Sequence, residues 1–122
     1  MTLNQITPEN TGKWDSIEST RDEMDWTLLD LAYNTAKENG LPFKFHTFVW
    51  GNQSPAWLAT LSADEQQVEL EEFMTAVAER YSDIAIIDVV NEPLHAPPVY
   101  KEALGGDGAT GWDRLLWPAA YG

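Results

Sequence analysis

Three short runs predicted to form strands, separated by two segments of helical periodicity, constrain the fold of this chain more than any other feature. The runs span residues 3–7, 43–49 and 84–90. Successive runs begin about 40 residues apart, which leaves room for a helix in each connection. Alternation of this kind predicts a parallel sheet with right-handed crossovers. The last run is rich in the β-branched residues Ile and Val, and we predict a strand buried on both faces there.

Both helices have recognisable ends and apolar stripes. The first is expected to start at an N-cap, Thr27, and to end at Gly40. Its predicted buried stripe is Leu28, Leu31, Ala32, Thr35 and Ala36. The second is expected to start at Ser62, with Glu65 as its capping-box partner. Its predicted buried stripe is Leu70, Phe73, Met74, Val77, Ala78 and Tyr81.

Composition narrows the function classes. A chain of 122 residues is the size of one domain, and the net charge of −13 argues against nucleic acid and anionic membranes as partners. Cysteine is absent, so disulfides and thiolate metal sites are excluded. Residues 1–5 lack the features of a signal peptide. The Gly-rich stretch 105–111 follows no predicted strand and is expected to be a loop.

Polar and aromatic side chains follow each predicted strand. The candidate site residues are Glu9, Asn10 and Lys13 after the first run, His46, Trp50 and Gln53 in and after the second, and Asn91 and Glu92 after the third. Because parallel strands deliver their carboxyl ends to one edge, we expect these residues to gather there, where α/β enzymes place their active sites. Hydrogen-bonding groups mixed with indole rings suit a neutral sugar.

Each of these residues also has a purely structural interpretation. His46 could be a hydrogen-bonded core histidine, and Trp50 and Trp57 could anchor loops or the core. Glu92 could begin a solvated loop. We favour a site because three such groups fall on successive strand ends. His46 and His95 share no ligand spacing, so no metal site is predicted.

Three motifs in this order resemble a known family. They are TPENTGKW at residues 7–14, HTFVWGNQSPAW at 46–57 and DVVNEP at 88–93. Together they resemble the signatures of glycoside hydrolase family 10, whose members are mainly endo-1,4-β-xylanases. The Asn-Glu-Pro motif alone is shared with family 5 cellulases, so the first two motifs select family 10.

The resemblance implies an α/β fold, the (β/α)8 TIM barrel. This chain would supply a partial barrel, from about the second to the fourth strand, with three parallel strands and two long helices. The implied domain is residues 1–122, a partial family 10 catalytic domain without the first and the later strands. Residues 114–122 depart from the expected next helix.

The resemblance also implies roles in a retaining endo-1,4-β-xylanase. Glu92 would be the general acid/base, and Asn91 would bind the 2-hydroxyl of the sugar at the cleavage point. His46 and Trp50 would line that subsite with Gln53 nearby. The next xylose would be held by Glu9, Asn10 and Lys13. The family's nucleophile lies on the seventh strand, so we expect the chain alone to be inactive and to act within a longer enzyme.

The resemblance implies xylan or xylo-oligosaccharides as partners, no cofactor and an extracellular location. Self-association through exposed sheet edges is also expected of a partial barrel. Two alternatives stay open: an inactive fragment that at most binds xylo-oligosaccharides, and a family 5-like β-glycanase.

Overall fold

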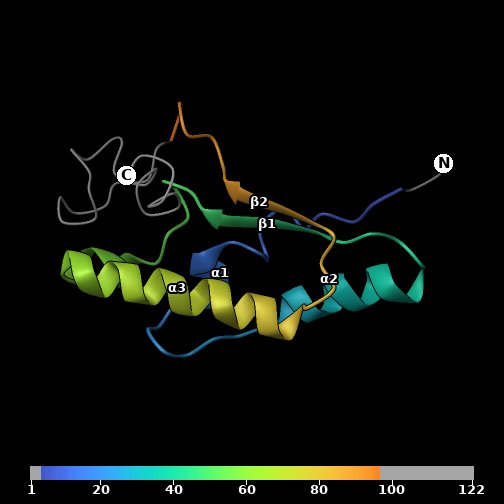
Figure 1. Ribbon diagram of the computed structural model, residues 1–122, viewed down its shortest axis with the longest axis horizontal. Coiled ribbons are helices and arrows are strands. Elements are labelled where there is room, and N and C mark those ends of the chain that lie inside the picture. The colour runs from blue at the N-terminus through green and yellow to red at the C-terminus, as the bar shows by residue number, and fades with distance from the viewer. Residues whose placement is uncertain (1–3, 97–122) are drawn as a thin grey trace, which may run out of the picture.

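The computed structural model describes residues 4–96. Its elements in chain order are α1 (Trp14–Ile17), α2 (Thr27–Glu38), β1 (Lys44–Val49), the 3₁₀ helix η1 (Ala56–Thr60), α3 (Ala63–Arg80) and β2 (Ile86–Val90). The two strands run parallel, and α2 and α3 lie on one side of them (Figure 1). The predicted loop at residues 105–111 and the divergent tail at 114–122 lie outside the described residues.

The parallel sheet was predicted correctly in direction, but the first predicted strand is reduced to one bridge. Ile6 pairs with Phe43, and its carbonyl accepts a hydrogen bond from the Lys44 amide at 2.9 Å. Pro8, two residues later, has no N–H to continue the ladder. Within residues 4–96 the sheet therefore has two strands, with β1 between β2 and the Ile6 bridge.

The prediction that the third run is buried on both faces is wrong. Ile86 and Ile87 on β2 are 41% and 43% exposed. Their neighbours across the ladder are Lys44 and Phe45, and Phe45 is fully buried. The difference arises because β1 is the one strand that pairs with β2 in the described part of the chain, which leaves the other edge of β2 uncovered.

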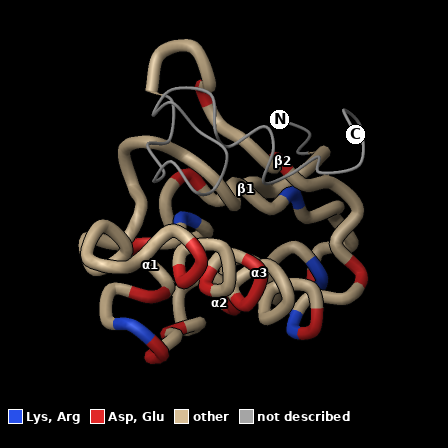
Figure 2. The backbone as a smooth tube through the Cα atoms, turned by 60° about the vertical axis from the view of Figure 1, so that its left-hand side comes forward, with Lys and Arg blue, Asp and Glu red and all other residues tan. Residues whose placement is uncertain are grey.

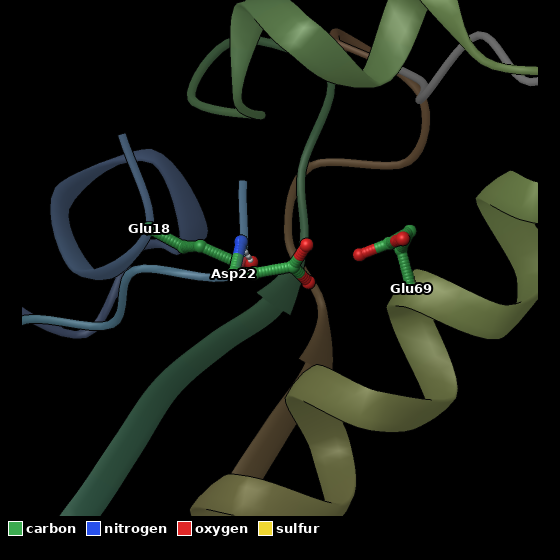
Figure 3. Close-up of side chains that lie close together, drawn as sticks. All are labelled: Glu18, Asp22 and Glu69. Atoms are coloured by element: carbon green, nitrogen blue, oxygen red, sulfur yellow. Dashed lines mark hydrogen bonds between the residues drawn. The ribbon is translucent and has the colours of Figure 1, made fainter. Parts of the chain in front are cut away.

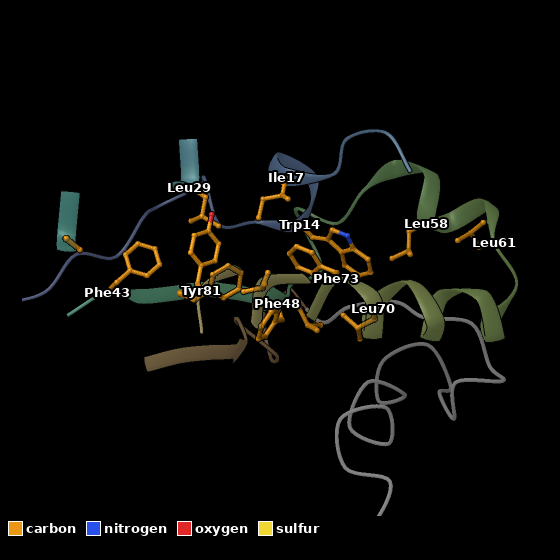
Figure 4. Close-up of a cluster of buried hydrophobic side chains, with 14 of the residues drawn as sticks. Trp14, Ile17, Leu29, Phe43, Phe48, Leu58, Leu61, Leu70, Phe73 and Tyr81 are labelled. Carbon is orange, nitrogen blue, oxygen red and sulfur yellow. The ribbon is translucent and has the colours of Figure 1, made fainter. Parts of the chain in front are cut away.

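Aromatic rings fill the space between the strands and the helices. The Trp14 ring lies parallel to that of Phe73, with 5.0 Å between centroids, and Phe48 meets Phe73 edge-on at 5.9 Å (Figure 4). All three side chains are buried. This packing joins α1, β1 and α3 into one core, so the loop that contains α1 is held against the strands.

The second predicted helix forms as expected. In α3 the Ser62 hydroxyl accepts from the Glu65 amide, and the Glu65 carboxylate accepts from the Ser62 amide at 2.8 Å, which completes the predicted capping box. The predicted stripe is buried at Leu70, Phe73, Val77 and Tyr81, half-buried at Met74 and exposed at Ala78.

The first predicted helix exists, but its predicted N-cap is wrong and its predicted buried stripe is only partly correct. Thr27 is the first helical residue, and its amide donates to the Asp25 carboxylate at 2.9 Å. Leu28 and Leu31 are 62% and 65% exposed. Ala36 is buried and Ala32 packs against the core, as predicted, but Leu29 and Tyr33 face the core in place of the two exposed leucines. The predicted and the observed sets of positions both have helical spacing. The observed set includes Tyr33, whose ring contacts the rings of Phe43 and Tyr81.

Acidic residues dominate the surface. The chain carries 20 Asp and Glu against 7 Lys and Arg, and acidic positions follow the helices and their loops (Figure 2). Among the described helices, none combines the length and apolarity that spanning a membrane requires.

Candidate functional site

A solvent-open hollow of about 470 Å³ lies beside the two strands. It is lined by residues from three separate segments of the chain: Thr7, Pro8, Glu9, Asn10 and Lys13 from the loop after Ile6, Lys44, His46 and Trp50 from β1 and its end, and Asp88 from β2. The hollow therefore brings together five of the eight predicted site residues: Glu9, Asn10, Lys13, His46 and Trp50.

Lys13 is one of the two lysines that line this hollow, the other being Lys44. Its Nζ donates to the Gln53 side-chain oxygen at 3.2 Å and lies 4.0 Å from the centroid of the Trp50 ring, a cation–π contact. Burial lowers the pKa of Lys13, while the charges of Asp15, Glu92 and Glu9 act in the opposite direction. Gln53 does not line the hollow itself, but its hydrogen bond to Lys13 holds its side chain next to a residue that does.

Glu92 and Asn91 lie where β2 ends. The Asn91 amide donates to the Val49 carbonyl at 2.9 Å, which keeps the end of β2 beside the end of β1. At Glu92 the backbone turns into the left-handed region, with φ of 47°. Its exposed carboxylate accepts a hydrogen bond from Trp50 Nε1 at 3.1 Å. Glu92 is therefore linked to the wall of the hollow through the Trp50 indole.

His46 is held by a carboxylate of the neighbouring strand. Asp88 Oδ2 lies 2.9 Å from His46 Nδ1 and 2.9 Å from Lys44 Nζ. Burial acts to raise the pKa of the Asp88 carboxyl, but hydrogen bonds from Lys44 and His46 hold it below its ordinary value. The His46 ring is thus hydrogen-bonded, as its structural interpretation expects, but it is half-buried rather than part of the core. The same residue also lines the hollow.

Sequence reasoning did not select Lys44 and Asp88. Both lie inside strands, whereas the candidate residues were sought mainly at strand ends. The sequence signal that could have found them is that each is a charged residue among the apolar residues of a predicted strand. Trp57 does not line the hollow: its Nε1 donates to the Glu18 carbonyl at 2.9 Å and its ring meets Trp14 edge-on, so it anchors the loop to the core.

One group of carboxylates in the described part of the chain could approach a metal ion. Ligand atoms of Glu18, Asp22 and Glu69 lie within 4.8 Å of one another (Figure 3). Glu18 accepts from Trp14 Nε1 and from the Asp22 amide, both at 2.8 Å, and Glu69 is paired with Arg21. These contacts already satisfy the two buried carboxylates, so the group is a structural network that ties α1 to α3.

The hollow combines an indole face, a buried ammonium, an imidazole and carboxylates. Indole rings support the apolar face of a sugar, and the polar groups can bind its hydroxyls. A carboxyl group held by an indole N–H beside such a surface can serve as a general acid or base.

Comparison with known proteins shows which family the sequence matches. The family model described as glycosyl hydrolase family 10 matches residues 1–115. Endo-1,4-beta-xylanase B of Cellvibrio japonicus is 50% identical over 106 residues, which cover 85% of this chain and 18% of that protein. Endo-1,4-beta-xylanase 3 of Hypocrea jecorina is 37% identical over 92 residues, which cover 74% of this chain and 26% of that protein.

Solved structures of xylanases share the fold. A glycosylated endo-beta-1,4-xylanase from Gloeophyllum trabeum superposes with a TM-score of 0.76 at 26% identity, covering 94% of this chain and 38% of that one. Xylanase 10B from Thermotoga petrophila, solved with xylobiose, gives 0.74 at 30% identity, covering 93% of this chain and 36% of that one. The described elements are thus part of a (β/α)8 barrel, as predicted.

Proposed function

The chain belongs to glycosyl hydrolase family 10, and from this premise we propose that it forms the acid/base part of the active site of a longer endo-1,4-β-xylanase. It spans about a fifth to a quarter of the length of the two curated relatives compared above (18% and 26%). The single observation that carries the proposal is the hydrogen bond from Trp50 to Glu92, made beside a hollow lined by Glu9, Asn10, Lys13 and His46.

In this proposal Glu92 is the catalytic acid/base. Its carboxyl group protonates the glycosidic oxygen as the bond breaks and then activates the water that releases the product. Trp50 Nε1 holds the carboxylate in place, and Asn91 binds the 2-hydroxyl beside the cleavage point. A retaining glycosidase needs a second carboxyl group about 5 to 5.5 Å away. We assign that nucleophile to the part of the longer enzyme outside this chain.

In this proposal the residues in and beside the hollow bind the sugar. Trp50 offers a flat apolar face, and His46 and Gln53 add hydrogen-bonding groups near the cleavage point. Glu9, Asn10 and Lys13 bind the hydroxyls of the next xylose. Xylan is a polymer too large to cross a membrane, and we place the enzyme outside the cell.

A chimera tests this function directly. Residues 1–112 would replace the matching segment of full-length xylanase B from Cellvibrio japonicus, and reducing-sugar release from soluble xylan would be measured. We expect hydrolysis, and we expect Glu92→Gln to reduce it by about 100-fold or more, the usual effect of losing an acid/base group. An aryl xylobioside with an acidic leaving group should be less affected, because its departure needs little protonation.

The matched control is Glu79→Gln, which removes an exposed carboxylate from α3 outside the hollow. That chimera should keep its activity. An active chimera in which Glu92→Gln and Glu79→Gln behave alike would refute the role of Glu92.

A further inference from the structure

A second, smaller pocket lies beside the first loop. Its volume is about 150 Å³, and it is lined by Asn10, Thr11 and Ser16 from the loop and α1, and by Asp25 and Leu28 from the start of α2. Asn10 also lines the hollow, so the two cavities are neighbours that share one residue.

Backbone hydrogen bonds hold the walls of this pocket to those of the hollow. The Lys13 amide donates to the Asn10 carbonyl at 3.0 Å, and the Ser16 amide donates to the Lys13 carbonyl at 3.1 Å. The Asp25 amide donates to the Ile17 carbonyl at 2.7 Å, which fixes the start of α2 against α1. The residues of the pocket therefore have a set position relative to Asn10 and Lys13 in the hollow.

The polar walls of the pocket can accept and donate hydrogen bonds. A hydrogen bond from the Thr27 side chain, together with one from its amide, lowers the pKa of Asp25, so this carboxylate is ionised and only accepts. The Ser16 hydroxyl can do both. The Thr11 hydroxyl oxygen is buried and has no hydrogen-bond partner among the described residues. Buried hydroxyls are normally paired, so an unpaired one in the wall of a pocket favours a polar occupant.

Leu28 gives the pocket an apolar side. This residue is 62% exposed, so its side chain offers apolar surface to a ligand as well as to water. A volume of about 150 Å³ equals that of about five water molecules, which suits one small ring rather than a longer segment. None of the five lining residues is basic, which argues against an anion, and a single carboxylate is a sparse ligand set for a calcium ion.

We propose that this pocket binds one further pentose ring of a xylan chain, on the side of Asn10 away from the cleavage point. The inference rests on the proposed function, in which Glu9, Asn10 and Lys13 hold the xylose next to the one at the cleavage point. The ring is either the third xylose of the main chain or an arabinose branch on the second. Both present hydroxyls to Asp25 and Ser16 and a less polar ring face to Leu28.

Fluorescence titration of the 122-residue chain, followed through its Trp residues, tests the pocket. Xylobiose fills the hollow alone, xylotriose adds a third main-chain ring, and xylobiose with an arabinosyl group on its non-reducing xylose adds a branch. We expect one of the two larger sugars to bind about tenfold more tightly than xylobiose, the effect of one or two well-placed contacts. The sugar that gains affinity identifies the source of the ring.

Variants assign that gain to the pocket. Asp25→Ser withdraws the carboxylate but keeps an oxygen for the Thr27 amide, so α2 should still form. It should remove most of the tenfold gain and leave xylobiose binding unchanged. Leu28→Ser should also reduce the gain. Leu31→Ser is the matched control, because Leu31 is 65% exposed on the same helix but does not line the pocket, and it should keep the gain.

The outcomes separate this inference from the function on which it rests. If xylobiose binds and neither larger sugar binds more tightly, the pocket holds no ring and the inference is wrong. A gain that survives in both Asp25→Ser and Leu28→Ser would also overturn it. A folded chain that binds none of the three sugars would contradict the sugar site itself. If Asp25→Ser fails to fold, the comparison of Leu28→Ser with Leu31→Ser still decides.

Discussion

Gly12 shows how closely the first loop approaches β1. A Cβ atom at this position would lie 2.6 Å from the carbonyl oxygen of His46, a backbone atom with little room to move. The loop that carries Glu9, Asn10 and Lys13 therefore lies against β1 at His46, and both the loop and His46 line the hollow.

We predict that Gly12→Ala destabilises the chain by about 1–3 kcal/mol, the usual cost of overpacking, and weakens xylotriose binding because the loop must shift. Urea unfolding and fluorescence titration measure the two effects. Gly40→Ala is the matched control. Its Cβ would meet nothing within 4 Å, but its φ of 64° should cost about 1 kcal/mol and leave binding unchanged. A Gly12→Ala chain that unfolds and binds like the unmodified one would contradict this account.

Single residues were predictable from the sequence where their role depends on local position. Asn10, Trp50 and Glu92 follow strand ends, and parallel strands bring such ends together. Asp88 and Lys44 were missed because their contact depends on the register between two strands about 40 residues apart, which no local pattern specifies.

At the level of elements, α2 and α3 are joined by a charged contact at one end. Arg80 Nε and the Tyr81 hydroxyl both donate to Asp30 Oδ1, at 2.9 and 2.6 Å. The hydrogen bond from Arg80 lowers the pKa of Asp30, with Tyr81 acting in the same direction and burial opposing both. Asp30 therefore favours the folded state when it is ionised.

The sign of the pH dependence follows from this lowered pKa. The contribution is fully present above the unfolded pKa of about 3.9 and is lost as the pH falls through the lower folded value. We predict that Asp30→Asn lowers the free energy of unfolding by about 1 kcal/mol at neutral pH, a modest figure because both partners are partly exposed. Urea unfolding should show this difference shrinking below about pH 3. A difference for Asp30→Asn that stays constant as the pH falls would contradict the ion-pair explanation.

Helix boundaries were more predictable than helix faces. The capping box at Ser62 depends on residues three apart, so α3 could be placed from the sequence. The face of α2 could not, because Leu28 and Leu29 each start a plausible apolar stripe. The choice between them depends on which rings, here Phe43 and Tyr81, approach from elsewhere in the chain.

At the level of the whole molecule, the described sheet has an uncovered apolar edge on a strongly acidic chain. Ile86 and Ile87 are more than 40% exposed on β2, while the net charge of −13 opposes contact between copies. The fold as part of a barrel was predictable from three motifs, but the exposure of β2 was not, because an apolar run predicts burial whether or not a neighbouring strand is present.

We predict that the 122-residue chain self-associates through β2, more strongly in salt because salt screens the repulsion between copies. Sedimentation velocity at increasing concentration, in low and in about 0.5 M salt, measures this. Ile87→Lys should reduce association. Val68→Lys makes the same change at an apolar residue of α3 that is 59% exposed, and should have a smaller effect. A chain that stays monomeric under all these conditions would contradict the prediction.

The contacts around the hollow also have a consequence for the order of folding. Lys13 and Gln53 are 40 residues apart in the chain, and both His46 with Asp88 and Trp50 with Glu92 are 42 apart. Such contacts have high contact order, and each requires a long loop to close before it can form. We therefore expect the hollow to be completed after the local turns of α2 and α3. A sugar that binds only the completed hollow would shift the folding equilibrium by about 2.7 kcal/mol at 100 times its dissociation constant.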